Sequence, residues 1–295
     1  MMNSRTLLNL ALLLIVILLI TVVVLEPGKT PAPAPVLLTG LENSDVHKIK
    51  ILRKDKDSIE LEKIAGQWQM RAPYSLSANS YKVDSVLKVL KTETAAHYDM
   101  NGLDPARYDL LAPAVSMRIN DALQIDFGNL EPLQKQRYVR IDKQLYLIPD
   151  YYYYQLIGSS TDYLNHALIN ENEKITRLEL PELSLALTDG KWAVRPENTD
   201  YPADAYSDLF NEWQHAQALE LRPLTKKPES TDKPIRVFLQ GRDTPIEYRL
   251  QRTEDEFILR RPDKNIEYVM AADKADALLS LQTRKTDTDD TPAEK

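Results

Sequence analysis

The chain contains 295 residues, carries a formal net charge of −7 from 44 acidic and 37 basic side chains, and has no cysteine. A chain of this length can form one or two domains, each with a sizeable core. The acidic balance argues against binding to nucleic acid, and the lack of cysteine excludes disulfides and thiolate sites while suiting an oxidising compartment.

The N-terminal segment is predicted to be a membrane anchor. Residues 6–25 carry no charge, and about 20 residues at a rise of about 1.5 Å span a hydrocarbon core of about 30 Å. A cleaved signal peptide is the alternative, because Arg5 supplies a basic start. Its apolar stretch would be roughly 7–15 residues and would end at a small-residue cleavage site, whereas Glu26 and Pro27 follow here. We therefore expect residues 1–25 to form a cytoplasmic tip and an uncleaved transmembrane helix, with the bulk of the chain exported.

Two further segments are predicted to lie outside the domains. Residues 26–44 begin with alternating prolines between Pro27 and Pro35, which favour polyproline II at about 3.1 Å per residue. We interpret residues 26–44 as a stiff stalk; the alternative is a ligand for a groove that accepts proline-rich peptides. Residues 284–295 contain no large apolar side chain, which predicts a disordered tail.

The remaining chain is predicted to be a duplication. A glycine, a tryptophan two positions later and then a proline end a strand-like run in both halves of the chain. The two copies of this structural motif are Gly66, Trp68 and Pro73, and Gly190, Trp192 and Pro196. An amphipathic helix follows each motif, with apolar residues at i, i+3, i+4 and i+7. These residues are Val83, Val86, Leu87 and Leu90 in the first copy and Tyr206, Leu209, Phe210 and Trp213 in the second.

Alternation of apolar and polar residues predicts three strands before each of these helices and four after it. The predicted strands are 46–52, 58–64, 68–71, 115–119, 123–128, 137–141 and 145–149, then 175–180, 183–188, 192–195, 235–240, 246–251, 256–261 and 266–270. A closing helix is predicted at 151–157 and at 272–281. We therefore predict an α+β fold in which the N-terminal transmembrane helix precedes two tandem antiparallel-sheet-plus-helix repeats, residues 45–170 and 171–283.

The motifs resemble those of the bacterial family called domain of unknown function (DUF) 4340. Its pattern is Gly-x-Trp, a nearby proline, an Ala-Asp helix start, a Gly-Leu-Asp-Pro turn and a strand ending in glycine. The matching residues are Gly66, Trp68, Pro73, Gly102, Leu103, Asp104, Pro105, Gly128, Gly190, Trp192, Pro196, Ala203 and Asp204. Asn79 and Ser80 replace Ala-Asp in the first copy, residues 107–113 are additional there, and the second copy lacks the Gly-Leu-Asp-Pro turn.

The resemblance implies a place in the cell and a type of function. Members look like single-pass envelope proteins that accompany auxiliary subunits of ABC-type export or gliding-motility systems. It therefore implies an envelope protein with a protein partner. Together with the predicted anchor, we expect a protein of the bacterial inner membrane with a cytoplasmic N-terminus and a periplasmic bulk. The family supplies no catalytic residue.

Two pairs of residues in the motif have competing interpretations. Trp68 and Trp192 could present aromatic faces to a ligand such as a sugar, but a tryptophan at this position is more often part of the core between sheet and helix. Arg71 and Arg195 could bind an anion, but alternation places them on the solvent side, where a local salt bridge is the default.

The tetrapeptide Tyr151, Tyr152, Tyr153 and Tyr154 is the candidate partner-binding site. A helix starting here directs tyrosines to several sides, so at least one or two of them should be exposed, and exposed tyrosines often form binding surfaces. The alternative is that all four tyrosines are buried where the helix packs against the sheet and the neighbouring repeat.

The chain lacks patterns that would indicate catalysis, a metal or a cofactor. A metal site needs clustered ligands, whereas the histidines are scattered at His47, His97, His166 and His215. Gly158, Ser159 and Ser160 lack the second glycine of a nucleophile elbow, and no phosphate-binding glycine loop is present among 8 glycines. We therefore expect a protein that is not an enzyme.

Two functions follow from these observations. The first is a non-catalytic, membrane-anchored periplasmic scaffold, an accessory to an ABC-type transport or envelope complex. The alternative is a glycan- or peptide-binding module that uses the groove between the repeats. A large exposed apolar patch would favour the scaffold, whereas a concave pocket with Tyr, Trp and convergent polar groups would favour the binding module.

Overall fold

The computed structural model describes residues 4–25, 36–133, 135–197, 201–225 and 232–282, and it divides the chain into two compact units, Met1–Val36 and Leu37–Lys295. Residues 26–35 of the predicted stalk and the predicted tail at 284–295 lie outside the described residues. Those two predictions therefore stay untested.

The first unit contains the helix α1, Ser4–Leu25. A helix was expected here, because residues 6–25 are apolar and contain neither proline nor glycine. Over the described part of the chain, however, no helix has both the length and the apolar character needed to cross a bilayer. The transmembrane prediction for residues 6–25 is therefore not confirmed.

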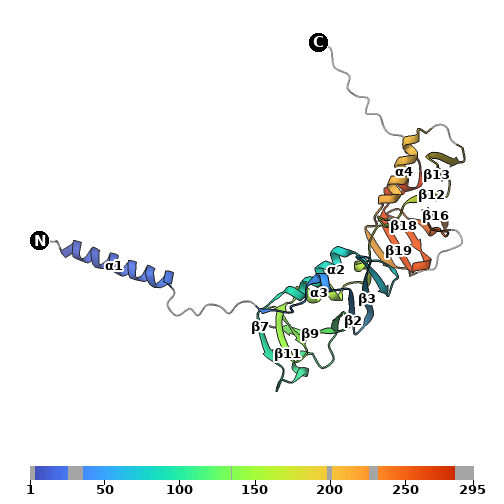
Figure 1. Ribbon diagram of the computed structural model, residues 1–295. Coiled ribbons are helices and arrows are strands. Elements are labelled where there is room, and N and C mark those ends of the chain that lie inside the picture. Colours follow the sequence, from blue (N-terminus) through green and yellow to red (C-terminus); the bar gives the residue numbers. More distant parts are fainter. Residues whose placement is uncertain (1–3, 26–35, 134, 198–200, 226–231, 283–295) are drawn as a thin grey trace, which may run out of the picture. The chain divides into compact units, whose positions relative to one another are not determined.

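The first repeat of the second unit is built on a nine-stranded sheet in which all neighbouring strands are antiparallel (Figure 1). The order across the sheet is β5-β4-β3-β2-β8-β9-β10-β11-β7. The bounds are β2 Lys48–Arg53, β3 Lys56–Ile64, β4 Gln67–Ala72, β5 Leu76–Ser77, β7 Ala96–Asp99, β8 Val115–Ile119, β9 Leu123–Glu131, β10 Gln136–Ile141 and β11 Gln144–Pro149.

The second repeat is built on an eight-stranded antiparallel sheet of order β14-β13-β12-β16-β17-β18-β19-β15. The bounds are β12 Ile175–Glu179, β13 Ser184–Thr188, β14 Lys191–Arg195, β15 Glu220–Pro223, β16 Lys233–Leu239, β17 Ile246–Arg252, β18 Glu256–Arg261 and β19 Ile266–Ala271.

From β4 and β14 onward the two sheets have the same strand order, so β3 corresponds to β13, β2 to β12, and β7 to β15. The strand β5 is the one addition of the first sheet within the described residues. Both repeats also contain a cis peptide bond before the motif proline, at Pro73 and Pro196. The predicted duplication of the fold agrees with this topology.

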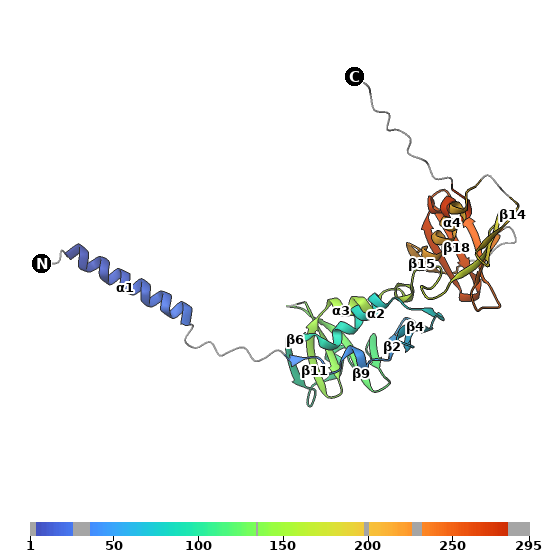
Figure 2. The ribbon, with the colours of Figure 1, turned by 45° about the horizontal axis from the view of Figure 1, so that its top comes forward.

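The helices bury the positions that the sequence pattern assigned to them. In the first repeat, α2 is Ser80–Leu87, the 3-10 helix η2 is Lys88–Lys91 and α3 is Tyr151–Ile157; α2 and α3 lie side by side along the sheet (Figures 1 and 2). In the second repeat, α4 is Ala203–His215 and α5 is Lys274–Leu279. The buried residues include Val83, Val86, Leu87, Leu90, Tyr206, Leu209, Phe210 and Trp213, and they belong to one core cluster that runs through both repeats.

The predicted stalk is wrong for residues 36–44. The short strand β1, Val36–Leu37, pairs with β6, Glu93–Thr94. Leu38 is 3% exposed, and its main-chain N–H donates to Thr92 O at 2.9 Å. Burial of a leucine against the first repeat, together with these main-chain hydrogen bonds, outweighs any tendency of this segment to remain extended in solvent.

Residues 100–113 of the first repeat include a segment around Tyr108 that packs against the strands β9 and β10. The Gly-Leu-Asp-Pro turn leads into the 3-10 helix η3, Pro105–Tyr108, whose N-cap Asp104 accepts a hydrogen bond from Ala106 N at 3.0 Å. Tyr108 packs edge-on against Tyr138, with ring centroids 4.9 Å apart. A Cβ atom on Gly128 would lie 2.1 Å from Tyr108 O, so this strand position requires glycine.

A linking segment, residues 163–168, is hydrogen bonded to both repeats. On the side of the first repeat, Asn165 N donates to Ser77 O at 2.9 Å. On the side of the second repeat, Leu168 N donates to Ala216 O at 3.0 Å, and Ala218 N donates to His166 O at 2.9 Å. The segment thereby continues the main-chain hydrogen bonding from one repeat into the other.

Candidate functional site

The tyrosine run forms the first turn of α3, and its four side chains divide into two kinds. Tyr151 and Tyr154 are 51% and 60% exposed, whereas Tyr152 is 7% exposed and Tyr153 is half-buried. Two tyrosines therefore pack and two face solvent, as expected for at least one or two of them, while partner binding stays a prediction. Two exposed aromatic rings one helical turn apart form a surface that a partner can contact.

The base of this helix is held in place by Arg137. Its guanidinium lies 3.6 Å from the ring centroid of Tyr153, its Nε donates to Asp150 Oδ1 at 2.5 Å, and an Nη donates to Gly128 O at 2.5 Å. Arg137 and Asp150 have largely buried side chains. A cation–π contact and a charge-assisted hydrogen bond in a sheltered position fix the start of α3.

The phenol of Tyr151 lies beside that of Tyr152, with ring centroids 4.0 Å apart. Partial burial and a hydrogen bond with Tyr152 raise the pKa of Tyr151 to about 12. The phenol of Tyr151 therefore stays neutral at physiological pH. Tyr151 and Tyr152 border a shallow hollow of about 560 Å³, together with residues 91–95, Gln136 and Pro149.

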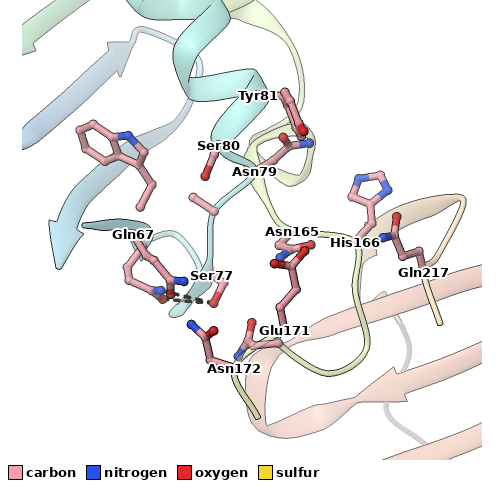
Figure 3. Close-up of a pocket in the computed structure, with 14 residues that line it drawn as sticks. Gln67, Ser77, Asn79, Ser80, Tyr81, Asn165, His166, Glu171, Asn172 and Gln217 are labelled. Atoms are coloured by element: carbon pink, nitrogen blue, oxygen red, sulfur yellow. Dashed lines mark hydrogen bonds between the residues drawn. The ribbon is translucent and has the colours of Figure 1, made fainter. Parts of the chain in front are cut away.

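A pocket of about 340 Å³ lies at the junction of the two repeats, and we call it the junction pocket (Figure 3). Its walls come from β4, β5 and the start of α2 in the first repeat, and from Gln217 in the second repeat. A further wall is formed by residues 165–172, which begin within the linking segment and end after it. The residues that line it are Gln67, Trp68, Gln69, Ser77, Ala78, Asn79, Ser80, Tyr81, Asn165, His166, Asn170, Glu171, Asn172 and Gln217.

A smaller pocket of about 190 Å³ adjoins the junction pocket and shares Gln69, Ser77, Asn165 and Asn170 with it. Its far wall belongs to the second repeat and is basic, with Arg242, Arg261 and Lys264. Arg242 is paired with Glu173, and Arg261 is paired with Asp263 at 2.9 Å. Two of the three cations are thus neutralised within the protein.

The motif tryptophans are part of the core. Trp68 is 5% exposed and is one of the residues that line the junction pocket. Trp192 is half-buried and packs edge-on against Phe210, with ring centroids 4.8 Å apart. The interpretation of both residues as packing residues is confirmed.

The remaining residues of the motif have local structural roles. Gly66 and Gly190 have φ values of +83° and +74° and follow Ala65 and Asp189, which also have positive φ. Two consecutive positive φ values are typical of a type I′ hairpin turn, where glycine is favoured. Arg71 forms the expected surface salt bridge, with its Nε 2.8 Å from Glu62 Oε2, and Arg195 is exposed.

The four histidines lie apart from one another. His47, His97 and His215 are exposed, and His166 lines the junction pocket with its Nδ1 3.1 Å from Ala218 O. The carbonyl accepts, so Nδ1 carries the proton and Nε2 is left as an acceptor in the neutral ring. Within the residues that the structure describes, no group of three His, Asp or Glu side chains has the arrangement of a metal site.

Comparison with known proteins identifies the family. The sequence matches the family described as "Domain of unknown function (DUF4340)" over residues 68–234, which is more than half of the chain. The chain belongs to the DUF4340 family. Comparison with curated proteins and with solved structures gave no match.

The DUF4340 match is narrower than the two predicted repeats, residues 45–170 and 171–283. It begins at Trp68 in β4 and ends at Pro234 in β16, so it includes most of the first repeat and the first part of the second. The tyrosine run, the linking segment and every lining residue of the junction pocket except Gln67 lie inside it.

The lining of the junction pocket was not predicted from the sequence. Its residues are mostly polar and come from 67–69, 77–81, 165–172 and Gln217, which are far apart in the chain and share no periodic pattern. The one local signal is the run Asn165, Asn170 and Asn172, because three carboxamides within eight residues between two predicted domains mark a polar boundary.

Proposed function

We propose that this DUF4340 protein is a non-catalytic, single-pass membrane-anchored scaffold in the periplasm, an accessory to an ABC-type transport or envelope complex. The observation that supports it best is the division of the tyrosine run. Tyr151 and Tyr154 are exposed, while Tyr152, Tyr153 and Arg137 fix the helix beneath them. Exposed tyrosines on a fixed base lose little side-chain entropy on binding and are favoured in protein interfaces.

The anchor in this proposal is the apolar segment 6–25. Ten residues, 26–35, separate it from β1, and ten residues span at most about 36 Å. In an anchored protein the first repeat would therefore work close to the membrane. The mass of the mature protein tests the anchor: we expect the full chain, and a soluble product that starts near residue 30 would show that the segment is a cleaved signal.

Affinity purification from solubilised membranes tests the scaffold. We expect Tyr151→Ser or Tyr154→Ser to abolish recovery of partner proteins while the variant stays folded. Tyr98→Ser is the matched control, because Tyr98 is also about half exposed but lies on β7 and not on α3. Unchanged recovery in both α3 variants would contradict the proposal.

Substitution of the four histidines tests for a catalytic or metal-dependent role. His47→Ala, His97→Ala and His215→Ala should each leave partner recovery and cellular function unchanged, and His166→Ala, in the wall of the junction pocket, should leave partner recovery unchanged. Loss of function in one of the first three variants, with the protein still folded, would replace the scaffold by a catalytic or metal-dependent role.

Ligand binding between the repeats is the second candidate function. The supporting observation is the junction pocket, which is concave, includes Trp68 and Tyr81, and is polar elsewhere except at Ala78. Its volume lies at the lower end of the range of roughly 300–1,000 Å³ for small-molecule sites. The two functions use different surfaces and can be tested separately.

A further inference from the structure

The lining of the junction pocket is dominated by one functional group. Seven of the fourteen lining residues end in a carboxamide, and the others include the hydroxyls of Ser77, Ser80 and Tyr81. A carboxamide offers both donors and acceptors, and so does an alcohol. The natural complement of such a wall is a ligand with many neutral hydroxyl or amide groups.

Several of these carboxamides are available to a ligand. Gln67, Asn172 and Gln217 are exposed, and among the described residues their side chains have no hydrogen-bond partner. Figure 3 shows Gln67, Asn172 and Gln217 on different walls, with Asn165 and Glu171 between them. Asn165 uses only its Oδ1, which accepts from Ala167 N at 3.0 Å, so its amide group can still donate.

The charge of the pocket argues against an anionic ligand. Among the described residues that line it there is no lysine or arginine, and Glu171 adds a carboxylate. The basic residues of the adjoining pocket, Arg242 and Arg261, already pair with Glu173 and Asp263. A single carboxylate among seven amides also gives little preference for a cation over a neutral group.

An extended peptide is disfavoured because the strand edges along the pocket are occupied. Peptides that add to a sheet need free main-chain donors and acceptors. Here Asn165 N donates to Ser77 O at 2.9 Å, Ala78 N to Trp68 O at 2.9 Å, and Asn79 N to Tyr163 O at 2.8 Å. Side chains must therefore provide the recognition.

Tyr81 supplies a flat apolar surface at the rim. It is 89% exposed in the first turn of α2, next to the helix cap Asn79, whose Oδ1 accepts from Lys82 N at 3.2 Å. Aromatic rings at the edge of polar pockets offer an apolar face to the C–H side of a ligand while its polar groups bond elsewhere.

We propose that the junction pocket binds a neutral saccharide, with Gln67, Asn172 and Gln217 as hydrogen-bonding partners and Tyr81 as the stacking residue. This inference rests on the second candidate function, ligand binding between the repeats, and gives its ligand class. It does not depend on the scaffold function of α3.

Calorimetric titration of the full-length protein in phospholipid nanodiscs tests the proposal, because nanodiscs avoid detergents with sugar headgroups. The neutral probes are maltotriose, cellotriose and triacetylchitotriose; the comparison probes are trigalacturonic acid and trialanine. We expect at least one neutral trisaccharide to bind, and both comparison probes to bind at least tenfold more weakly or not at all.

Variants assign the binding to the pocket. Asn172→Ala and Gln217→Ala should each raise the dissociation constant roughly three- to tenfold, the effect of one lost hydrogen bond, and Tyr81→Ala should weaken binding as well. Gln240→Ala is the control, because Gln240 is an exposed carboxamide of the second repeat outside the pocket. The thermal unfolding midpoints should match in all four variants, since the replaced side chains are exposed.

Three results would overturn the proposal: none of the neutral trisaccharides binds, or binding is unchanged in the pocket variants, or trigalacturonic acid binds as well as the best neutral probe. Binding of trialanine alone would also overturn it, while leaving ligand binding at the junction in place. Partner recovery with Tyr151→Ser and Tyr154→Ser reports on the scaffold independently of all these outcomes.

Discussion

The hydroxyl of Tyr248 on β17 donates a hydrogen bond of 2.7 Å to the main-chain carbonyl of Leu168, the last residue of the linking segment. Both residues are buried. The ring of Tyr248 also contacts Trp213 and Tyr268, with centroids 6.0 Å and 5.9 Å apart. Through this contact the core of the second repeat holds the segment that leads back to the first.

Tyr248→Phe should destabilise the protein by about 1–3 kcal/mol, because it leaves a buried carbonyl without a donor while keeping the ring. The free energy of unfolding in urea measures the effect. Tyr146→Phe is the control, since Tyr146 packs against the core of the first repeat and the structure shows no hydrogen bond for its hydroxyl. Equal stability of the two variants would contradict the role of the Tyr248 hydroxyl.

Substitution by serine should lower the free energy of unfolding strongly at Tyr152 of α3 and hardly at all at Tyr154. Tyr152→Ser should cost about 3–5 kcal/mol, because it removes a buried aromatic ring and leaves a cavity. Tyr154→Ser should change the free energy of unfolding by less than about 0.5 kcal/mol, as exposed positions usually do. Chemical denaturation of both variants provides the measurement, and a large loss in Tyr154→Ser would mean that its ring packs and is not free for a partner.

Asp126 should make the first repeat sensitive to acid. Its carboxylate accepts hydrogen bonds from Ser116 Oγ at 2.7 Å, from Gln124 Nε2 at 2.9 Å and from Arg140 at 2.6 Å. Burial alone would raise the pKa of this carboxyl, but the bonds from Ser116, Arg140 and Gln124 outweigh burial and lower the pKa below its ordinary value of 3.8.

The pKa of Asp126 is lower in the folded protein than in the unfolded chain. Its contribution to stability is therefore present above about pH 4 and is lost as the pH falls through the folded-state pKa. Asp126→Asn should therefore be less stable than the parent at pH 7 and equally stable in strong acid. Urea unfolding as a function of pH tests this. Asp121→Asn, which removes an exposed partner of Lys48, should follow the parent curve closely; a parallel offset of Asp126→Asn at every pH would contradict the assignment.

Gly128→Ala should lower the free energy of unfolding by about 1–3 kcal/mol, the usual cost of overpacking. The new Cβ would lie 2.1 Å from Tyr108 O, so either β9 or residues 100–113 must move. Gly40→Ala is the control, because a Cβ there meets no atom within 4 Å. Faster proteolysis within residues 100–113 in Gly128→Ala, compared with Gly40→Ala, would locate the displacement.

The repeated fold was predictable because its signals are local. Positions i, i+3, i+4 and i+7 define the buried side of a helix whatever surrounds it, and Val83 and Tyr206 both begin such a set. The short edge strands β7 and β15 were missed, because each has only four residues and neither shows a clear alternation: β7 has one half-buried side chain, and β15 has one buried and one half-buried side chain that are adjacent. Residues 36–44 were misassigned, because proline content indicates an extended chain but not whether Leu38 finds a core to enter.

The junction pocket was not predictable for a different reason. Its walls depend on the pairing of Asn165 with Ser77 and of His166 with Ala218, contacts between residues that are 88 and 52 positions apart. Such pairings are set by the way in which the repeats are joined, and polar side chains such as Asn172 and Gln217 give no periodic pattern. The tyrosine run, in contrast, was noticed from composition alone, although only the packing of α3 decides which rings are exposed.

The main-chain bonds of the linking segment also have a mechanical consequence. If the N-terminus is held at a membrane and a partner pulls on the second repeat, the tension must pass through residues 163–168. The hydrogen bonds from Asn165 to Ser77 and from Leu168 to Ala216 must break before this segment can lengthen. A force on one repeat should therefore move the other repeat as well. A flexible interdomain linker would instead extend and leave the other repeat in place.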